Sequence, residues 1–336
     1  MTRARTSPTP SPAGLPAAVS VLAGRSDGPA AGYVVLTTVT GTGFSALADT
    51  ALTTWEGPGA TGLRFYVRDL DSGMFWSTGR PASSGTARIL SYWIPGVFIV
   101  EHTENEVRAT LETCVLPDRP AELRRLTLTN LSGAARRLEV TSLAEVVLNQ
   151  KDAHAAHPVF SKLFLRTEYV GEQQSLLVHR RPRAPHEHHH TLIHSVLETG
   201  AVELETDRAR FHGRGHHAER PAALLSPEPL SGTVGNVLDP VVCLRRTLTV
   251  PAGRSVSVTF LLGAAADAQM ARALPAALDH GVAIDQVFAS ARAAAEDQLT
   301  RLGVSASDHV HAQHLAAAIL RGDPVLRADP ATLARA

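Results

Sequence analysis

The fold of this chain is decided by stretches such as Val107-Arg108-Ala109-Thr110-Leu111-Glu112, in which apolar residues occupy every second position. The stretch Val256-Ser257-Val258-Thr259-Phe260 has the same pattern nearly 150 residues later. A period of two places successive side chains on opposite faces of a β-strand. Each stretch therefore predicts a strand with one buried and one solvated face.

Further runs of β-branched and apolar residues surround these two, and turn sequences such as Asp71-Ser72-Gly73 and Pro251-Ala252-Gly253 separate them. Many short strands without an intervening helical pattern are typical of antiparallel sheets stacked face to face. The chain is thus predicted to be mainly β, a large antiparallel sandwich. The predicted strands cover residues 33–40, 63–69, 87–94, 97–102, 107–115, 123–130, 138–148, 159–169, 175–181, 192–198, 241–250 and 255–262.

The composition narrows the classes of function. Among 336 residues, 32 basic and 32 acidic side chains give no net charge, so the chain has no broad basic surface for nucleic acid or an anionic membrane. Two cysteines are too few for a disulfide framework, and no Cys-x-x-Cys pair is present. No apolar run approaches the roughly 20 residues of a membrane helix. The prolines at positions 8, 10, 12 and 16 argue against a signal peptide, so we expect a soluble cytoplasmic protein.

Three regions follow from the change of pattern along the chain. Residues 1–31 are rich in Pro, Ser, Thr, Gly and Ala and are predicted to be a disordered lead-in. Residues 32–264 form the sandwich, and residues 265–336 read as helices. Their predicted bounds are 267–279, 284–302, a third helix capped by Ser307-Asp308 and ending near residue 320, and a fourth opening at Pro330.

The helical pattern also predicts which side chains are covered. Ile284, Phe288 and Leu299 recur at helical spacing and are expected to bury their side chains on the sandwich. Leu315 and Ile319 are expected to stay exposed and to favour self-association.

No complete catalytic constellation is present. The run His186-Glu187-His188-His189-His190 satisfies the H-E-x-x-H pattern of zinc peptidases, but prolines precede it and a strand follows, so a histidine-rich surface loop is the prediction. Gly41-Thr42-Gly43-Phe44 lacks the third glycine of a dinucleotide loop and is a turn. We predict no catalytic residue, no metal ligand and no cofactor in this chain.

The remaining chemistry is ligand binding by aromatic and planar polar side chains. Sugars are held by aromatic faces and by bidentate groups that bind hydroxyls, and two loops at strand ends combine such residues. A tryptophan at a strand end is also typical of a core, and both roles stay open for Trp76. The candidate substrate-binding residues are Arg68, Asp71, Trp76, Arg80, His157, Phe160 and Lys162.

An ordered series of segments resembles a known family. The segments are Gly41–Ser45, Tyr66–Gly73 with Trp76-Ser77, Glu139–Leu148, Ala156–Phe164, Glu205–Gly215 and Leu230–Pro240. From about Gly32 onward the chain is similar to the glycoside hydrolase family 94 region of cyclic β-1,2-glucan synthases and β-1,2-oligoglucan phosphorylases.

The resemblance implies an N-terminal β-supersandwich related in shape to galactose mutarotase, then a helical linker, then an (α/α)₆ barrel that carries the catalytic acid and the phosphate site. Residues 323–330 resemble the stretch just ahead of that barrel, so the resemblance implies a chain truncated before it. No family catalytic residue can be assigned here.

Two functions from different classes remain. The first is a carbohydrate-binding or scaffold domain of a β-glucan-processing glycosyltransferase or phosphorylase, inactive alone. Its partners would be a β-glucan oligosaccharide, a barrel domain and a second copy of the chain. The alternative is an autonomous mutarotase-like sugar epimerase in which His157 acts with Glu145 or Glu168 on one concave sheet face.

Overall fold

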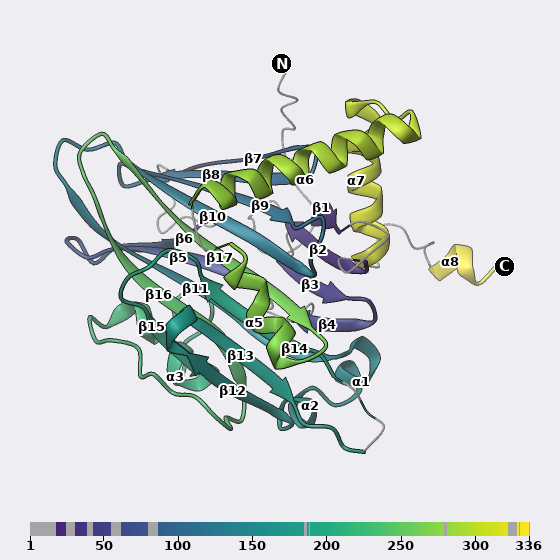
Figure 1. Ribbon diagram of the computed structural model, residues 1–336, viewed down its shortest axis with the longest axis horizontal. Coiled ribbons are helices and arrows are strands. Elements are labelled where there is room, and N and C mark those ends of the chain that lie inside the picture. The colour runs from purple at the N-terminus through teal and green to yellow at the C-terminus, as the bar shows by residue number, and fades with distance from the viewer. Residues whose placement is uncertain are drawn as a thin grey trace.

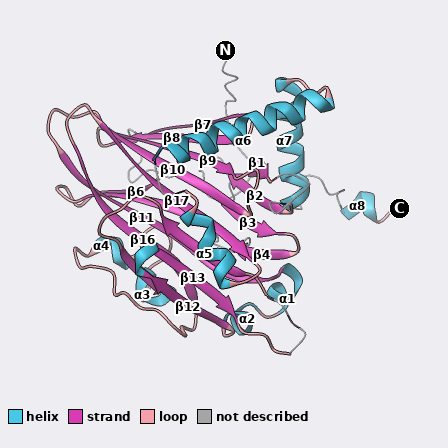
Figure 2. Cartoon of the chain, in the orientation of Figure 1, coloured by secondary structure: helices cyan, strands magenta, loops and turns pink. Residues whose placement is uncertain are grey.

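Two antiparallel β-sheets are packed face to face, with helices at the periphery (Figures 1 and 2). The structure is a computed structural model that describes residues 18–24, 31–38, 43–54, 62–79, 87–184, 187, 189–278, 281–321, 328 and 330–335. The predicted fold class, a large antiparallel sandwich followed by helices, is confirmed.

The first sheet has the strand order β1-β2-β3-β4-β11-β16-β15, and β5 and β6 are attached beside β11. β11 is long enough to pair on one edge with β5 through Leu138–Leu143 and then with β4, after a register shift between Val146 and Asn149. The bounds are β1 Ala18–Ala23, β2 Tyr33–Thr38, β3 Gly43–Leu47, β4 Thr50–Thr53, β5 Arg64–Asp69, β6 Phe75–Ser77, β11 Arg136–Gln150, β15 Glu203–Asp207 and β16 Pro240–Val250.

The second sheet has the order β12-β13-β14-β17-β10-β9-β8-β7. Its centre is the pair β10–β17, where Leu126 lies opposite Val258 in a continuous antiparallel register. The bounds are β7 Arg88–Ile94, β8 Val97–Glu104, β9 Val107–Val115, β10 Ala121–Asn130, β12 Leu165–Val170, β13 Ser175–Arg180, β14 Thr191–Val196 and β17 Ser255–Ala265.

The main hydrophobic core lies between the two sheets, and the period-two pattern selects its members. In β11, Leu138, Val140 and Ala144 belong to this core. The residues between them, Glu139 and Leu143, belong to the opposite face of the same strand. We call that opposite face, formed by β5, β11, β16 and β15, the outer face of the first sheet.

The outer side of the second sheet is covered by α5 (Ala268–Ala276) and α6 (Gly281–Leu302), as Figure 1 shows. Ile284 and Phe288 are 6% and 5% exposed, as predicted, and Leu299 is half-buried. Arg125 of β10 joins the helix to the sheet, because its Nη1 donates to Asp285 Oδ1 at 2.5 Å and its guanidinium lies 4.6 Å from the Phe288 ring centre.

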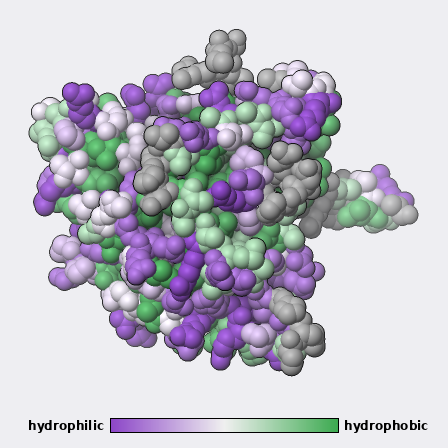
Figure 3. All heavy atoms as spheres, viewed as in Figure 1, coloured by the Kyte–Doolittle hydropathy of each residue, from purple (hydrophilic) through white to green (hydrophobic). Residues whose placement is uncertain are grey.

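α7 (Ala306–Arg321) packs on β1, where Gln313 Oε1 accepts a hydrogen bond from the backbone N–H of Val21 at 2.6 Å. Its Leu315 and Ile319 are 55% and 60% exposed, which confirms the predicted exposure of these side chains. α8 (Pro330–Leu333) lies away from the sandwich in this view, and polar and apolar side chains are interspersed over the visible face (Figure 3). No helix of the described residues is long and apolar enough to cross a membrane.

Four short helices flank the first sheet: α1 Lys151–Ala156 and α2 Pro158–Lys162 follow β11, and α3 Arg208–His212 and α4 Ala222–Leu225 lie on the outer face. A 3₁₀ turn, Gly171–Gln173, lies between β12 and β13. α3 and α4 belong to the segment from residue 208 to residue 239, which we call the 208–239 loop. Phe211 and Leu224 of this loop pack on Tyr66, Leu143 and Cys243 of the outer face.

Two predictions about local structure are corrected. Residues 158–162 form a helix, so the strand predicted over 159–169 begins only at Leu165, because Pro158 fixes a helical φ at the first position. Residues 18–23, assigned to a disordered lead-in, form β1 through antiparallel pairing with β2. The other residues of the lead-in up to 30, apart from Gly24, lie outside the described residues.

Candidate functional site

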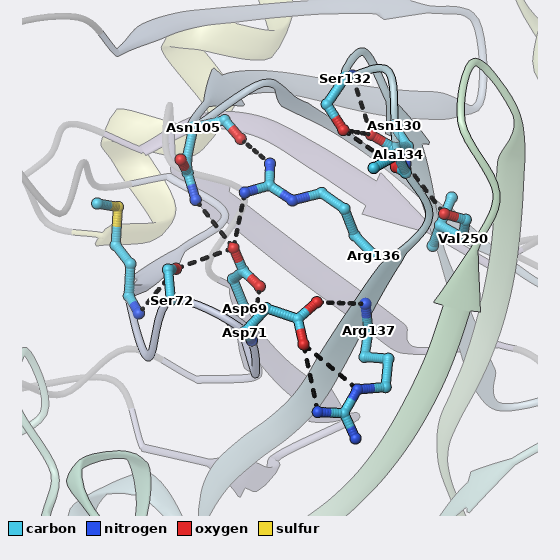
Figure 4. A network of polar contacts seen from close by, with 11 residues as sticks. Asp69, Asp71, Ser72, Asn105, Asn130, Ser132, Ala134, Arg136, Arg137 and Val250 are labelled. Carbon is cyan, nitrogen blue, oxygen red and sulfur yellow. Dashed lines mark hydrogen bonds and ion pairs between the residues drawn. The ribbon is translucent and has the colours of Figure 1, made fainter.

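The turn between β5 and β6 is held by a buried carboxylate, Asp69, which Figure 4 shows at the centre of a polar network. Its oxygens accept from Ser72 Oγ at 2.9 Å, from the Asp71 backbone N–H at 3.0 Å, from Asn105 Nδ2 at 3.2 Å and from Arg136 Nη2 at 2.8 Å. Burial alone would raise the pKa of Asp69, but these hydrogen bonds and Arg136 outweigh it and lower the pKa. The network joins three hairpins and is structural.

Asp71, a predicted sugar ligand, lies on the exposed side of this turn. Its carboxylate is 3.2 Å from Nη2 of Arg137, and both side chains are at least half exposed (Figure 4). Arg68, at the end of β5, points to the outer face and is 7% exposed, with Nη1 donating to the Ser226 carbonyl at 2.6 Å. Arg68 and Asp71 therefore do not converge on a common solvent-exposed surface.

Trp76 belongs to the core and offers no free face to a ligand. It is 1% exposed, packs in the cluster between the sheets and makes an edge contact with the buried His102 ring at 6.5 Å between ring centres. The physical reason is its position at the middle of β6, opposite the core residue Val67. Of the two roles left open for Trp76, sugar ligand and core residue, its burial supports the core residue. Arg80 lies outside the described residues.

The other predicted loop, around α2, does reach the surface. Phe160 is 51% exposed, and its ring makes an edge contact with Phe164 at 5.2 Å. The guanidinium of Arg183 lies 6.0 Å and 5.7 Å from the centres of these two rings. An aromatic ring beside a planar cation is the kind of surface that binds the C–H faces and hydroxyls of a sugar.

Lys162 ties this loop to the outer face of the first sheet. Its Nζ lies 2.5 Å from Asp239 Oδ1 and 3.4 Å from Glu145 Oε2. Arg208 completes the group, with Nε 2.7 Å from Glu145 Oε1 and Nη1 3.6 Å from Asp239 Oδ2. We call these four side chains the charged quartet. Sequence reasoning named Lys162 and Glu145 but not the other two, although both lie in segments of the family resemblance.

The quartet keeps the Glu145 carboxylate ionised. Burial would raise the pKa of Glu145, but the charges and hydrogen bonds of Lys162 and Arg208 outweigh it and lower the pKa. Such a carboxylate is a fixed ion-pair partner and a poor proton acceptor near neutral pH. The backbone N–H of Arg208 also donates to the Asp239 carbonyl at 3.0 Å, so the quartet closes the two ends of the 208–239 loop.

The carboxylates that the epimerase alternative requires are already in ion pairs with cationic side chains. Glu145 belongs to the quartet, and Glu168 pairs with Arg272 at 2.6 Å. The His157 side chain is exposed between α1 and α2. Glu145 acts on the pKa of both His154 and His212, yet burial, together with Lys162 or Arg208, lowers both pKa values.

No metal centre emerges from the part of the chain that the structure describes, where no three His, Cys, Asp or Glu side chains are grouped as ligands. In the histidine-rich loop, His189 Nε2 lies 3.3 Å from Glu187 Oε2. His186 and His188 lie outside the described residues.

The fold and the site define a class: a two-sheet β-supersandwich with an exposed aromatic edge and ion-paired carboxylates. Residues 30–280 match the family model of the glycosyl hydrolase 94 supersandwich domain. The chain belongs to this family.

Two relatives have described activities. The chain is 32% identical over 312 residues to the cyclic β-(1,2)-glucan synthase NdvB of Rhizobium meliloti (strain 1021). The aligned region covers 90% of the chain and 11% of that protein. It is 27% identical over 213 residues to the solabiose phosphorylase of Paenibacillus borealis, which covers 62% of the chain and 27% of that protein. The chain therefore spans about a tenth and about a quarter of these relatives.

Solved structures give more distant likenesses. A bacterial glucoamylase complexed with acarbose matches 86% of the chain and 40% of its own, with a TM-score of 0.46 and 9% identity. A putative aldose 1-epimerase from Escherichia coli K12 matches 70% of the chain and 97% of its own, with a TM-score of 0.41 and 8% identity.

Proposed function

We propose that this chain is a carbohydrate-binding and scaffold domain of a β-glucan-processing enzyme, and that an (α/α)₆ barrel outside the described residues supplies the reaction centre. Family membership and the identity to a cyclic β-1,2-glucan synthase support this role. On its own the domain binds glucan and does not make or break a glycosidic bond. A cytoplasmic location and assembly into a homodimer belong to the same proposal.

The observation that carries the proposal is the chemistry of the exposed surface around α2, formed by Phe160, Phe164 and Arg183, which we call the α2 edge. It exposes Phe160 beside Arg183, whereas the carboxylates of Glu145 and Asp239 are held by cations. General acid–base catalysis needs a group that can exchange a proton near the working pH. An aromatic surface next to ion-paired carboxylates is suited to holding a sugar chain.

Affinity electrophoresis of the purified chain in gels containing linear β-1,2-glucan tests the proposal. We expect the wild type to be retarded and Phe160→Ala to lose most of the retardation, because the substitution removes the exposed ring. Leu131→Ala is the matched control, since Leu131 is similarly exposed, at 45%, on a different loop. Equal retardation of wild type and Phe160→Ala would disprove binding at this edge.

Activity is measured on the same preparation. Release of glucose 1-phosphate from β-1,2-oligoglucan and phosphate should be absent, and anomer interconversion of glucose should proceed at the uncatalysed rate. Turnover in the first assay would show that the chain holds its own reaction centre, and catalysis in the second would favour the epimerase alternative.

A further inference from the structure

The 208–239 loop is bound to the outer face of the first sheet through its backbone carbonyl groups. Arg64 Nη1 and Tyr66 Oη donate to the Ala218 carbonyl at 3.0 and 2.7 Å. Arg245 Nη2 donates to the Ala223 carbonyl at 2.7 Å, and Arg68 Nη1 donates to that of Ser226 at 2.6 Å. Three arginines of the sheet thus hold oxygen atoms of one covering segment.

Several polar atoms under this loop have no hydrogen-bond partner among the described residues. They are Arg64 Nε, Arg68 Nε, Glu139 Oε1 and His212 Nδ1, and each of these residues is at most 7% exposed. Buried polar groups are nearly always satisfied, because an unsatisfied one costs about 1–3 kcal/mol. Three on the sheet face and one on the loop that covers it indicate that a polar molecule belongs between them.

Arg68 and Glu139 mark the position most clearly. Arg68 Nη1 and Glu139 Oε1 are 4.0 Å apart, which is an ion-pair contact but too long for a hydrogen bond. Arg245 Nε is 3.2 Å from the same Glu139 oxygen without the alignment of a hydrogen bond. A group that accepts from Arg68 and donates to Glu139 would satisfy both side chains at once.

Hydroxyl groups have this double capacity, whereas an inorganic anion would be repelled by the carboxylates of Glu139 and Glu203. The covering turn leads to the solvent, since Leu225 is 41% exposed and residues 227–229 are exposed. The geometry points to a binding site for one sugar ring, taken up through adjacent hydroxyls between Arg68, Glu139 and the turn at residues 225–229. This site is separate from the α2 edge and stands independently of it.

Isothermal titration calorimetry of the full chain tests the site, with glucose, the β-1,2-linked glucose disaccharide and inorganic phosphate as the three probes. We expect a sugar to bind the wild type and Arg68→Gln and Glu139→Gln to weaken it roughly 10-fold or more, as for loss of a hydrogen bond to a charged group. Arg254→Gln is the matched control, because Arg254 is exposed in the β16–β17 turn. Phe160→Ala removes the ring of the α2 edge, so the sugar binding that remains in this variant reports the site at Arg68 and Glu139.

Hydrogen exchange on the wild type provides a measurement that needs no variant, in case a substitution prevents folding. The sugar should slow exchange of the backbone amides of residues 225–228 that carry an N–H. Binding of phosphate in place of sugar, heat of binding unchanged in both glutamine variants, or no sugar binding to the wild type would each overturn the inference. Loss of sugar binding in Phe160→Ala alone would also overturn it while supporting the α2 edge.

Discussion

Replacing Gly96 with alanine tests whether α6 is locked against the sandwich. Gly96 lies in the β7–β8 turn at φ +75°, and an added Cβ would be 2.4 Å from the carbonyl oxygen of Ala291 in α6. That oxygen is backbone, so the helix must shift before the methyl group fits. Gly73, at φ +73°, has no heavy atom within 4 Å of the same position and isolates the effect of the backbone conformation.

The free-energy cost of the backbone conformation and that of the steric contact can be estimated separately. Placing alanine at a positive φ costs about 1–2 kcal/mol, and this applies to both glycines. Forcing extra volume into a packed contact costs about 1–3 kcal/mol more, which applies only to Gly96. We therefore expect Gly73→Ala to lower the free energy of unfolding by about 1–2 kcal/mol and Gly96→Ala by about 2–5 kcal/mol.

Urea unfolding followed by tryptophan fluorescence measures the difference, because Trp93 lines the hollow between Gly96, α6 and α7 and reports on their docking. Hydrogen exchange of the α6 amides should be faster in Gly96→Ala and unchanged in Gly73→Ala. Equal destabilisation of the two variants, with equal exchange in α6, would refute the close approach of the helix to the turn.

Three further predictions concern the quartet, a buried histidine and α7. Lys162→Met should raise the pKa of Glu145. In the wild type the lowered pKa of Glu145 stabilises the folded chain above the unfolded pKa, and this stabilisation is lost as the pH falls. In urea titrations between pH 6 and pH 3 the variant should therefore lose less stability than the wild type, by roughly 1 kcal/mol. Burial lowers the pKa of His194 to about 4. Between pH 7 and pH 4 the unfolded histidine gains a proton before the folded one does, so His194 should lower the wild-type free energy of unfolding by ~3 kcal/mol. This contribution of His194 to the pH dependence should be absent in His194→Gln. Glutamate at both Leu315 and Ile319 should reduce self-association in sedimentation velocity without changing the melting temperature by more than a few degrees; an unchanged sedimentation profile of an associated wild type would contradict that role.

The period of the apolar residues was enough to predict the sandwich. Stretches such as Val107–Glu112 alternate because one sheet face is buried, and the helical spacing of Ile284 and Phe288 likewise predicted which side of α6 is covered. α2 is not predicted by the residue pattern, because Val159 and Phe160 are strand-forming residues, although Pro158 fixes a helical φ at the first position of the helix.

The site was only partly predictable, because its contacts join distant segments. The charged quartet brings together residues from 145 to 239, and no local pattern reports such pairing. Trp76 and Arg68 occupy alternate faces at one end of the sandwich, and composition could not tell which face a covering loop would bury. Phe160 was a candidate because it is an aromatic residue near charged residues at a predicted strand end, and the structure exposes its ring.

The two ends of the 208–239 loop are tied to each other, since Arg208 and Asp239 share a backbone hydrogen bond and an ion pair. Glu145 pairs with Arg208 and Lys162 pairs with Asp239, so both ends are also held to neighbouring elements. A segment anchored at its base tolerates a change of length farther out, because closing a longer flexible excursion costs only about 0.6 kcal/mol per doubling. The exposed stretch at residues 227–229 is consequently a suitable insertion point for an epitope or a fluorescent reporter, and the strands beneath should keep their pairing when one is grafted there.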